Sequence, residues 1–376
     1  MPFIGNKPTA IPLSADDLED NIISTAKIQD NAVTPAKYIE PIPFRNIIIN
    51  GDMSIAQRAT STSSITGDGY HTVDRFNNEM NTAGTWTQSQ STDVPTGQGF
   101  ATSLKYDCTT ANGSLSAGSF GFLSQRFEGQ NLQYLKYGTS SAESLTLSFW
   151  VKSNKTGTYI VEMVSFATTK SQSQSYTISS ADTWEKKTLT FTGDTATAIA
   201  NNNARSFNLN FWLVAGTTYT SGTLNTSYNT TTNANRSVGQ VNLADSTSNE
   251  WYVTGVQLEA GTTASDFEFL PYDVNLQRCQ RYFEQMDADY PGFSAGTKGA
   301  STGYTVIFKT TKRATPTMSD VTLRNSQAGT TATVSASGSG WTFESGARYA
   351  TSGTTGSTGD GMHVYASNGI QADAEL

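Results

Sequence analysis

The amino-acid sequence predicts an all-β protein built on an antiparallel β-sandwich of two sheets. Serine and threonine make up roughly a quarter of the 376 residues, and glycine occurs 32 times. This composition is typical of strands joined by many turns. About ten short strand-like segments lie between residues 45 and 272, and no long amphipathic helix is available there for the crossovers of a parallel sheet. Antiparallel pairing is therefore expected.

Residues 1–44 are expected to form a short N-terminal arm without a core of its own. Two related segments, Asp20–Lys27 and Asp30–Lys37, begin ten residues apart. Both are too short to bury a core, and Pro35 interrupts any helix across the second copy. The arm is interpreted either as a flexible leader or as a docking segment that orders against a neighbour.

Residues 45–272 alternate apolar and hydroxylated residues with the period of a strand. The pattern is clearest in Leu145–Lys152, and Asn208–Val214 begins in the same way. Tyr159–Phe166 and Trp251–Glu259 are two further strand segments. Each strand is expected to turn one face toward a shared core.

One helix is predicted over residues 273–286, inside a connecting segment at 273–290. Its apolar residues recur every three or four positions, which would align them as a stripe on one face. The stripe comprises Leu276, Cys279, Phe283 and Met286. Two interpretations are open, packing against the chain's own domain or a seam between subunits.

Net charge and hydropathy argue against two classes of partner. The formal net charge of −8 is unfavourable for binding nucleic acid, which requires clustered positive charge. No stretch approaches the roughly 18 apolar residues that cross a bilayer, so no membrane insertion is expected. The chain opens without a signal-peptide pattern. Its two cysteines, Cys108 and Cys279, are expected to be free, buried thiols.

The chain offers little for catalysis, and neither an enzymatic activity nor a cofactor is expected. The two histidines, His71 and His363, fall in different predicted domains. Glycoside cleavage needs only two carboxyl groups, and four lie close together in the sequence, Glu250, Glu259, Asp266 and Glu268. We interpret these four as solvated loop charges.

Sugar binding has better physical support, because aromatic rings stack on pyranose rings while polar side chains bind the hydroxyl groups. Tyr219 and Tyr228 flank a loop rich in Thr, Asn and Ser, which favours their exposure. Trp150 and Trp184 are interpreted as structural. For Trp212, a place in the core is favoured, and a place on a sheet face is the alternative. Residues 291–376 predict a small C-terminal β domain, whose sugar-binding candidates are Trp341, Tyr349, His363 and Tyr365. These four residues would serve equally well as the core of that domain.

Several motifs, taken in order, resemble the jelly rolls of carbohydrate-binding modules. They are Asn50–Arg58, Leu145–Lys152, Asp182–Phe191 and Val253–Glu259. The continuation through Ala260–Phe269 and Arg278–Phe283 resembles bacteriophage tail-fibre and related virion proteins, and the repeat in the arm resembles the start of fibre proteins from marine phages. The resemblance covers most of residues 1–286, and nothing after Tyr290 contributes to it.

This resemblance implies a tail fibre subunit that assembles as a homotrimer. Residues 1–44 would dock to other virion proteins, and the distal end would bind host surface polysaccharide. The chain would be made in the bacterial cytoplasm and reside in the virion. A head fibre or purely architectural component, a polysaccharide-degrading tailspike and a free carbohydrate-binding module are the alternatives.

One departure from the resemblance concerns calcium. Many carbohydrate-binding jelly rolls hold a structural calcium ion through paired acidic residues in the closing strand, where this chain has Thr254 and Gly255. The resemblance therefore does not predict a calcium site in this chain. Asp52, Asp287 and Asp289 remain possible oxygen ligands for calcium.

Overall fold

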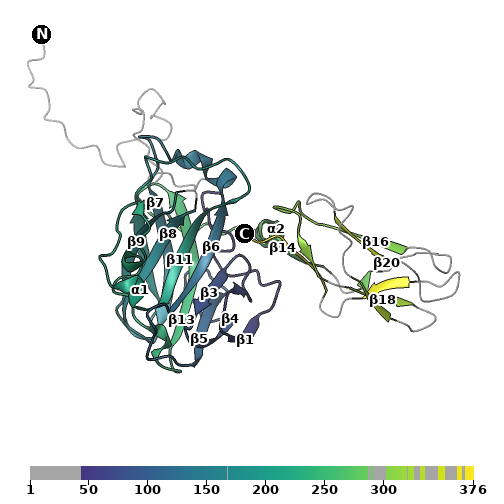
Figure 1. The fold of residues 1–376 in the computed structure, drawn as a ribbon, viewed down its shortest axis with the longest axis horizontal. Helices are drawn as coiled ribbons and strands as arrows, with labels where there is room; N and C mark the ends of the chain where they lie inside the picture. Colours follow the sequence, from purple (N-terminus) through teal and green to yellow (C-terminus); the bar gives the residue numbers. More distant parts are fainter. Residues whose placement is uncertain are drawn as a thin grey trace, which may run out of the picture. The chain divides into compact units, whose positions relative to one another are not determined.

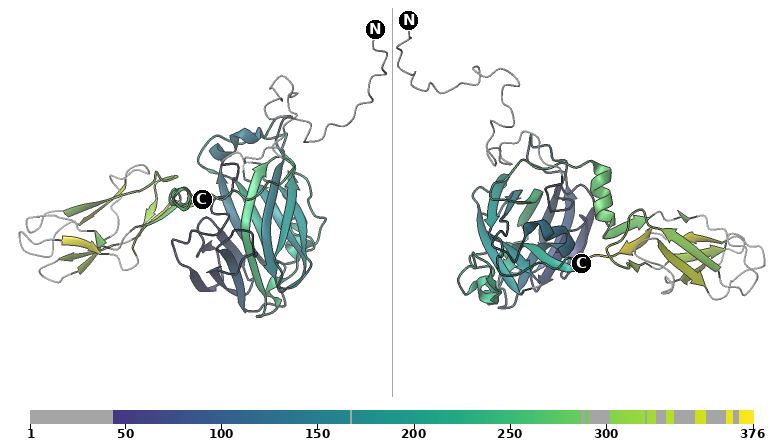
Figure 2. Two further views of the ribbon diagram at one scale, coloured as in Figure 1. Left: turned by 180° about the vertical axis from the view of Figure 1, so that it is seen from behind. Right: turned by 90° about the horizontal axis from the view of Figure 1, so that it is seen from above.

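The structure is a computed structural model that describes residues 44–166, 168–286, 289–290, 302–319, 321–325, 331–334, 346–351, 362–365 and 369–376. It confirms the predicted antiparallel β-sandwich (Figures 1 and 2). The six-stranded sheet has the order β1 (Ser61–Ile65), β4 (Thr85–Ser91), β5 (Ser103–Thr110), β13 (Glu250–Ala260), β7 (Leu145–Ser153) and β10 (Glu185–Phe191). The seven-stranded sheet has the order β12 (Asn229–Thr230), β9 (Lys170–Ile178), β8 (Gly157–Ser165), β11 (Arg205–Ala215), β6 (Phe120–Glu128), β3 (Asn77–Asn81) and β2 (Gly69–Tyr70).

Alternate residues of the long strands fill the core between the two sheets. On β7 the inward residues are Leu145, Leu147, Phe149 and Val151, and on β11 they are Phe207, Leu209, Phe211 and Leu213. None of these side chains is more than 2% exposed. Since successive residues of a strand point to opposite faces, the residues between them form the outer faces of the sandwich.

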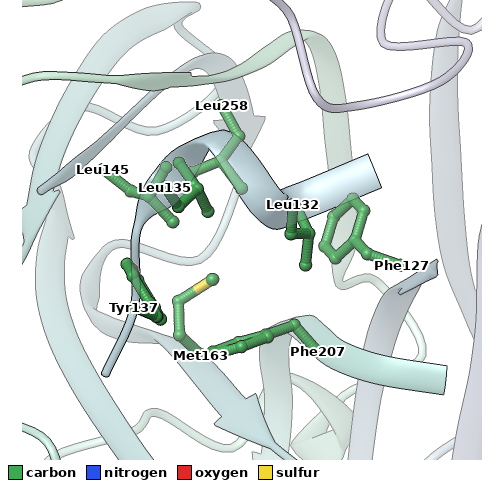
Figure 3. A pocket seen from close by; sticks show the side chains of 8 residues that line it. All are labelled: Phe127, Leu132, Leu135, Tyr137, Leu145, Met163, Phe207 and Leu258. Carbon is green, nitrogen blue, oxygen red and sulfur yellow. The ribbon is translucent and has the colours of Figure 1, made fainter. Parts of the chain in front are cut away.

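The core contains an apolar void that is too small to hold a water molecule (Figure 3). It is lined by Phe127, Leu132, Leu135, Tyr137, Leu145, Met163, Phe207 and Leu258. Part of its wall comes from η4 (Gly129–Leu135), the short 3-10 helix that follows β6. An enclosed apolar space of this size is a packing feature and not a ligand site.

A long connection between β11 and β13 covers part of the seven-stranded sheet. It contains α1 (Thr217–Thr220), β12, η5 (Asn233–Asn235) and η6 (Leu243–Asp245). Arg236 of this connection forms an ion pair with Glu162 of β8, with Nε and Nη2 at 2.7 and 2.8 Å from the two carboxylate oxygens. The Glu162 side chain is fully buried. This pair therefore fastens the connection to the sheet.

The predicted helix is correct only over its first part. Helix α2 spans Tyr272–Gln280, after which Phe283–Met286 forms strand β14. Strand β14 pairs with β22 (Ile370–Asp373), which is more than 80 residues away in the sequence. Pairing with so distant a segment overrides the local helical pattern, and no single-sequence periodicity contains that information.

The subunit seam predicted on this stripe is corrected by the same observation. Leu276 and Cys279 lie on α2, whereas Phe283 and Met286 lie on β14. Cys279, Phe283 and Met286 are at most 2% exposed, and Leu276 packs against the cluster that contains Cys279. The four residues therefore pack within their own chain, and they do not form a helical stripe that another subunit could cover.

The strands of the predicted C-terminal domain form further small antiparallel sheets. One contains β15 (Asp289–Tyr290), β21 (Met362–Tyr365), β18 (Val321–Asn325) and β19 (Thr331–Val334). A second pairs β16 (Thr302–Ile307) with β20 (Gly346–Thr351), and a third consists of β14, β22 and β17 (Thr317–Met318). The third sheet corrects the predicted boundary, because β22 returns to β14 and the last residues contact the sandwich.

The chain end is held on the sandwich by arginines. Arg75, next to β3 and 1% exposed, pairs with Glu375, and its guanidinium lies 3.5 Å from the centre of the Tyr282 ring. Arg58 pairs with Asp373 at 3.1 Å. The amide of Ala374 also donates to the carbonyl of Tyr282 at 2.7 Å. The residues that follow β22 thus lie against the sandwich.

Helix α2 is fixed by a buried carboxylate at the end of β6. Glu128, whose side chain is fully buried, accepts hydrogen bonds from Arg281 Nε and Nη2, both at 2.8 Å, and from the Tyr282 hydroxyl at 2.5 Å. Burial alone would raise the pKa of Glu128, but the hydrogen bonds from Arg281 and Tyr282 outweigh it and lower that pKa. Glu128 is therefore ionised and paired at neutral pH.

We predict that Glu128→Gln lowers the free energy of unfolding by about 3 kcal/mol, because it leaves the Arg281 charge without its carboxylate. Urea unfolding followed by circular dichroism measures the change. Glu143→Gln is the matched control, since the Lys136–Glu143 pair is 55% and 39% exposed. The control should shift stability by less than about 0.5 kcal/mol. Equal shifts for both variants would contradict the anchoring role of Glu128.

A second prediction concerns Asp74, a fully buried residue. Burial raises its pKa from 3.8 to about 6, although hydrogen bonds from Gln57 and the charge of Arg58 act in the opposite direction. The folded chain therefore holds this proton more tightly than the unfolded chain. The stability that this group contributes is fully present below about pH 4 and is lost as the pH rises through about 6.

The measurement is the difference in unfolding free energy between the unsubstituted chain and Asp74→Asn. This difference should shift against the unsubstituted chain by roughly 2 kcal/mol between about pH 4 and about pH 7. A difference that stays constant over this range would show that Asp74 does not titrate there.

Candidate functional site

Tyr228, a predicted sugar-binding residue, is half-buried and packs against the main core. Its ring lies 6.2 Å from the rings of both Tyr137 and Phe207. Burial raises the pKa of its phenol well above the ordinary value. Tyr228 is therefore less exposed than expected, because the Thr-, Asn- and Ser-rich segment around it pairs with β9 through its backbone and the ring packs against the core.

Tyr219 is half-buried on α1, over the outer face of the seven-stranded sheet. Its ring lies 5.4 Å from Trp212 and 5.8 Å from Phe120. Trp212 is fully buried, as expected for a structural residue, and its indole nitrogen donates to Glu162 at 3.2 Å. Arg236 covers the cluster, with its guanidinium 5.8 Å from the Tyr219 ring. The connection that follows β11 therefore closes most of these rings to a ligand.

The C-terminal candidates remain predictions. Trp341 lies outside the described residues. Only the backbone is described for Tyr349, which pairs with Tyr304 between β16 and β20. The same holds for His363 and Tyr365 of β21, whose partners on β18 are Arg324 and Thr322.

The outer face of the six-stranded sheet presents a group of aromatic and charged side chains that we call the aromatic–lysine face. It comprises Trp150, Trp184, Tyr252, Lys105, Lys152, Asp93 and Glu250. The register aligns Lys152, Tyr252 and Lys105 side by side on β7, β13 and β5. Trp150 lies in the neighbouring row, opposite Thr254. Trp150 and Trp184 are both half-buried, so part of each ring is open to solvent.

The lysines of this face lie against its aromatic rings. Lys152 Nζ is 4.4 Å from the centre of the Tyr252 ring and 5.7 Å from that of Trp184. Lys105 Nζ is 5.5 Å from the Tyr252 ring. The rings of Trp184 and Tyr252 meet edge to face at 6.1 Å. These cation–π and aromatic contacts fix the orientation of the face before any ligand arrives.

Two carboxylates complete the face. Asp93 accepts a hydrogen bond from Trp184 Nε1 at 2.9 Å and pairs with Lys152. Glu250 accepts from Lys105 Nζ and from the Tyr252 hydroxyl, each at 2.6 Å. Burial would raise the pKa of both carboxyl groups, but hydrogen bonds from Lys152 and Trp184 to Asp93, and from Lys105 and Tyr252 to Glu250, lower both values. Both groups are therefore ionised at neutral pH.

This arrangement combines ring surface with fixed hydrogen-bonding groups. Asp93 and Glu250 are 44% and 36% exposed, so each carboxylate can accept further hydrogen bonds from outside. Serine and threonine border the face, with Ser89 opposite Lys105 and Thr188 opposite Ser148. Such a surface suits a polar ligand with apolar faces.

The sequence contained a signal for this face that the motif-based interpretation missed. Trp150 occupies the same phase of β7 as Thr146, Ser148 and Lys152, whereas the core uses Leu145, Leu147, Phe149 and Val151. The alternation alone therefore assigns Trp150 to the outer face. Trp184 gave no such signal, because it precedes β10 and depends on Asp93 for its position.

Within the described residues, no group of three or more His, Cys, Asp or Glu side chains is placed to hold a metal ion. Asp52 instead accepts hydrogen bonds from Ser54 at 3.0 Å and Asn275 at 3.1 Å. Asp287 lies outside the described residues, and for Asp289 only the backbone is described. None of the helices in the described part is long and apolar enough to span a membrane.

The sequence matches no known protein family and no curated protein. Several solved structures are similar. The enzymatically active domain of tailspike protein 4 from bacteriophage CBA120 is 14% identical, with a TM-score of 0.31, over 58% of this chain and 22% of that chain. The module TmCBM61 in complex with β-1,4-galactotriose is 10% identical, with a TM-score of 0.29, over 57% and 99%.

A third similar structure is the family 11 carbohydrate-binding module from Clostridium thermocellum in complex with a mixed-linked tetrasaccharide. It is 11% identical, with a TM-score of 0.24, over 54% of this chain and 98% of that chain. Each of the three matches covers only part of this chain.

The partly exposed ion pairs of the aromatic–lysine face should contribute little to stability. We predict that Asp93→Asn lowers the free energy of unfolding by less than about 1 kcal/mol, because solvent screens a pair whose carboxylate is 44% exposed. Urea unfolding alongside Glu128→Gln measures this. A loss as large as that of Glu128→Gln would show that Asp93 is a folding determinant and not a surface group.

Proposed function

We propose that this chain is a bacteriophage virion appendage protein, a tail fibre subunit, whose sandwich binds host surface polysaccharide without chemical turnover. The main support for polysaccharide binding is the aromatic–lysine face, where Trp184, Trp150 and Tyr252 lie among fixed charged groups on one outer sheet face. Trp184 and Trp150 are partly exposed there above the buried Tyr252, in contrast to the fully buried Trp212.

The chemistry of this face fits a carbohydrate. A pyranose ring has apolar C–H faces that stack on Trp184 or Trp150 and hydroxyl groups that need both donors and acceptors. Lys105 and Lys152 supply the donors. Asp93 and Glu250 supply charge-assisted acceptors, which form stronger hydrogen bonds than neutral groups do.

The carboxylates nearest in sequence to this face support binding over cleavage. Glu259 accepts hydrogen bonds from the Ser265 amide at 2.9 Å and from its hydroxyl at 2.6 Å. Glu268 accepts from the Asn46 amide at 2.9 Å. Both are nearly buried and hold loop backbone, which corrects their interpretation as solvated charges.

The virion role rests on the sequence resemblance to phage fibre proteins. In this proposal residues 1–44 dock to other virion proteins, and the chain assembles as a homotrimer. Three copies of a weak site on one particle raise the apparent avidity by about 100- to 10,000-fold when they engage together. Modest affinity of a single face is therefore sufficient for adsorption.

We predict that Trp184→Ala weakens binding of full-length protein to host surface polysaccharide by about fivefold to thirtyfold, because a stacked ring contributes roughly 1 to 2 kcal/mol. Isothermal titration calorimetry measures the affinity, and the thermal midpoint confirms that the variant folds. Tyr134→Ala is the control, since Tyr134 is 49% exposed and lies away from this face on η4. Unchanged affinity for Trp184→Ala would refute this location of the site.

A further inference from the structure

Positive and negative charges balance across the aromatic–lysine face and its immediate margin. The lysines are Lys105, Lys152 and Lys186, the last lying opposite Trp150. The carboxylates are Asp93, Glu250 and Asp107, and the register aligns Glu250 with Asp107. Lys105 forms an ion pair with Glu250, and Lys152 forms one with Asp93.

This balance opposes an anionic ligand. A uronic acid or sulfate group approaching Lys152 meets Asp93, and one approaching Lys105 meets Glu250 with Asp107 beside it. The anion must either displace a carboxylate that is fixed to the same fold or lie next to it, and like charges in contact disfavour binding. Lys105 and Lys152 are therefore poor sites for an anion.

An uncharged sugar meets no such conflict. Its hydroxyl groups can donate to the exposed oxygens of Asp93 and Glu250 and accept from the lysines while both ion pairs stay intact. The rings of Trp184 and Trp150 require no charge in their ligand.

We propose that the aromatic–lysine face selects uncharged polysaccharide and that Asp93 and Glu250 reject anionic polymers by their charge. This inference rests on the proposed function, since it names the ligand class of the same face. Asp93 and Glu250 are specificity residues in this account, because they contact the ligand and exclude its charged competitors.

The test uses full-length protein on an array of purified bacterial surface polysaccharides that includes uncharged and anionic members. We expect the bound polymers to be uncharged, with signals that change less than about twofold when sodium chloride rises to about 0.5 M. Strongest binding to anionic polymers, with a loss of signal in salt, would overturn the inference and leave the proposed function standing. No binding to any polysaccharide would contradict the proposed function and the inference together.

A charge-removing double variant, Asp93→Asn with Glu250→Gln, sharpens the test. It should lose at least about threefold in affinity for the uncharged polymers and gain at least about threefold for anionic ones, because the lysines lose their intramolecular partners. Glu143→Gln is the control, a carboxylate outside this face. If both affinities fall together in the double variant, the carboxylates act only as structural supports and the selection mechanism is wrong.

Discussion

Burial of alternate side chains between two sheets is the constraint on which the rest of this structure depends. On β7, Leu147, Phe149 and Val151 point inward. Because side chains alternate along a strand, Ser148, Trp150 and Lys152 lie on the outer face. The same rule on β13 and β5 aligns Tyr252 with Lys105. The aromatic–lysine face is therefore a by-product of core packing, and a one-residue slip of any of these strands would destroy it.

Buried ion pairs supply the second level of organisation. Glu162 with Arg236 closes one connection over the seven-stranded sheet, and Glu128 with Arg281 holds α2 at the end of β6. Both carboxylates are fully buried, so their cations are needed to compensate the desolvation. The oxygens of Glu162 and Glu128 are buried within these pairs, whereas Asp93 and Glu250 keep exposed oxygens. That difference separates structural carboxylates from those available to a ligand.

Periodicity in the sequence predicted the sandwich and its long strands, because the alternation of apolar and polar residues within each of those strands shows which face is buried. It did not predict the end of α2, since β14 forms by pairing with residues near the C terminus. It also did not show that Tyr228 is half-buried, because polar neighbours in the sequence do not reveal that the ring packs against the core. Trp184 was missed for a similar reason, as its position depends on a hydrogen bond to Asp93 from a distant loop.

The central claim is that ligand binds across β10, β7 and β13, and hydrogen exchange of full-length protein with and without host polysaccharide tests it most directly. The account predicts slower amide exchange in the segment around Asp93 and in the residues leading from Trp184 into β10, with the connection around Arg236 unchanged. Protection confined to residues 302–365, with none on the six-stranded sheet, would contradict it.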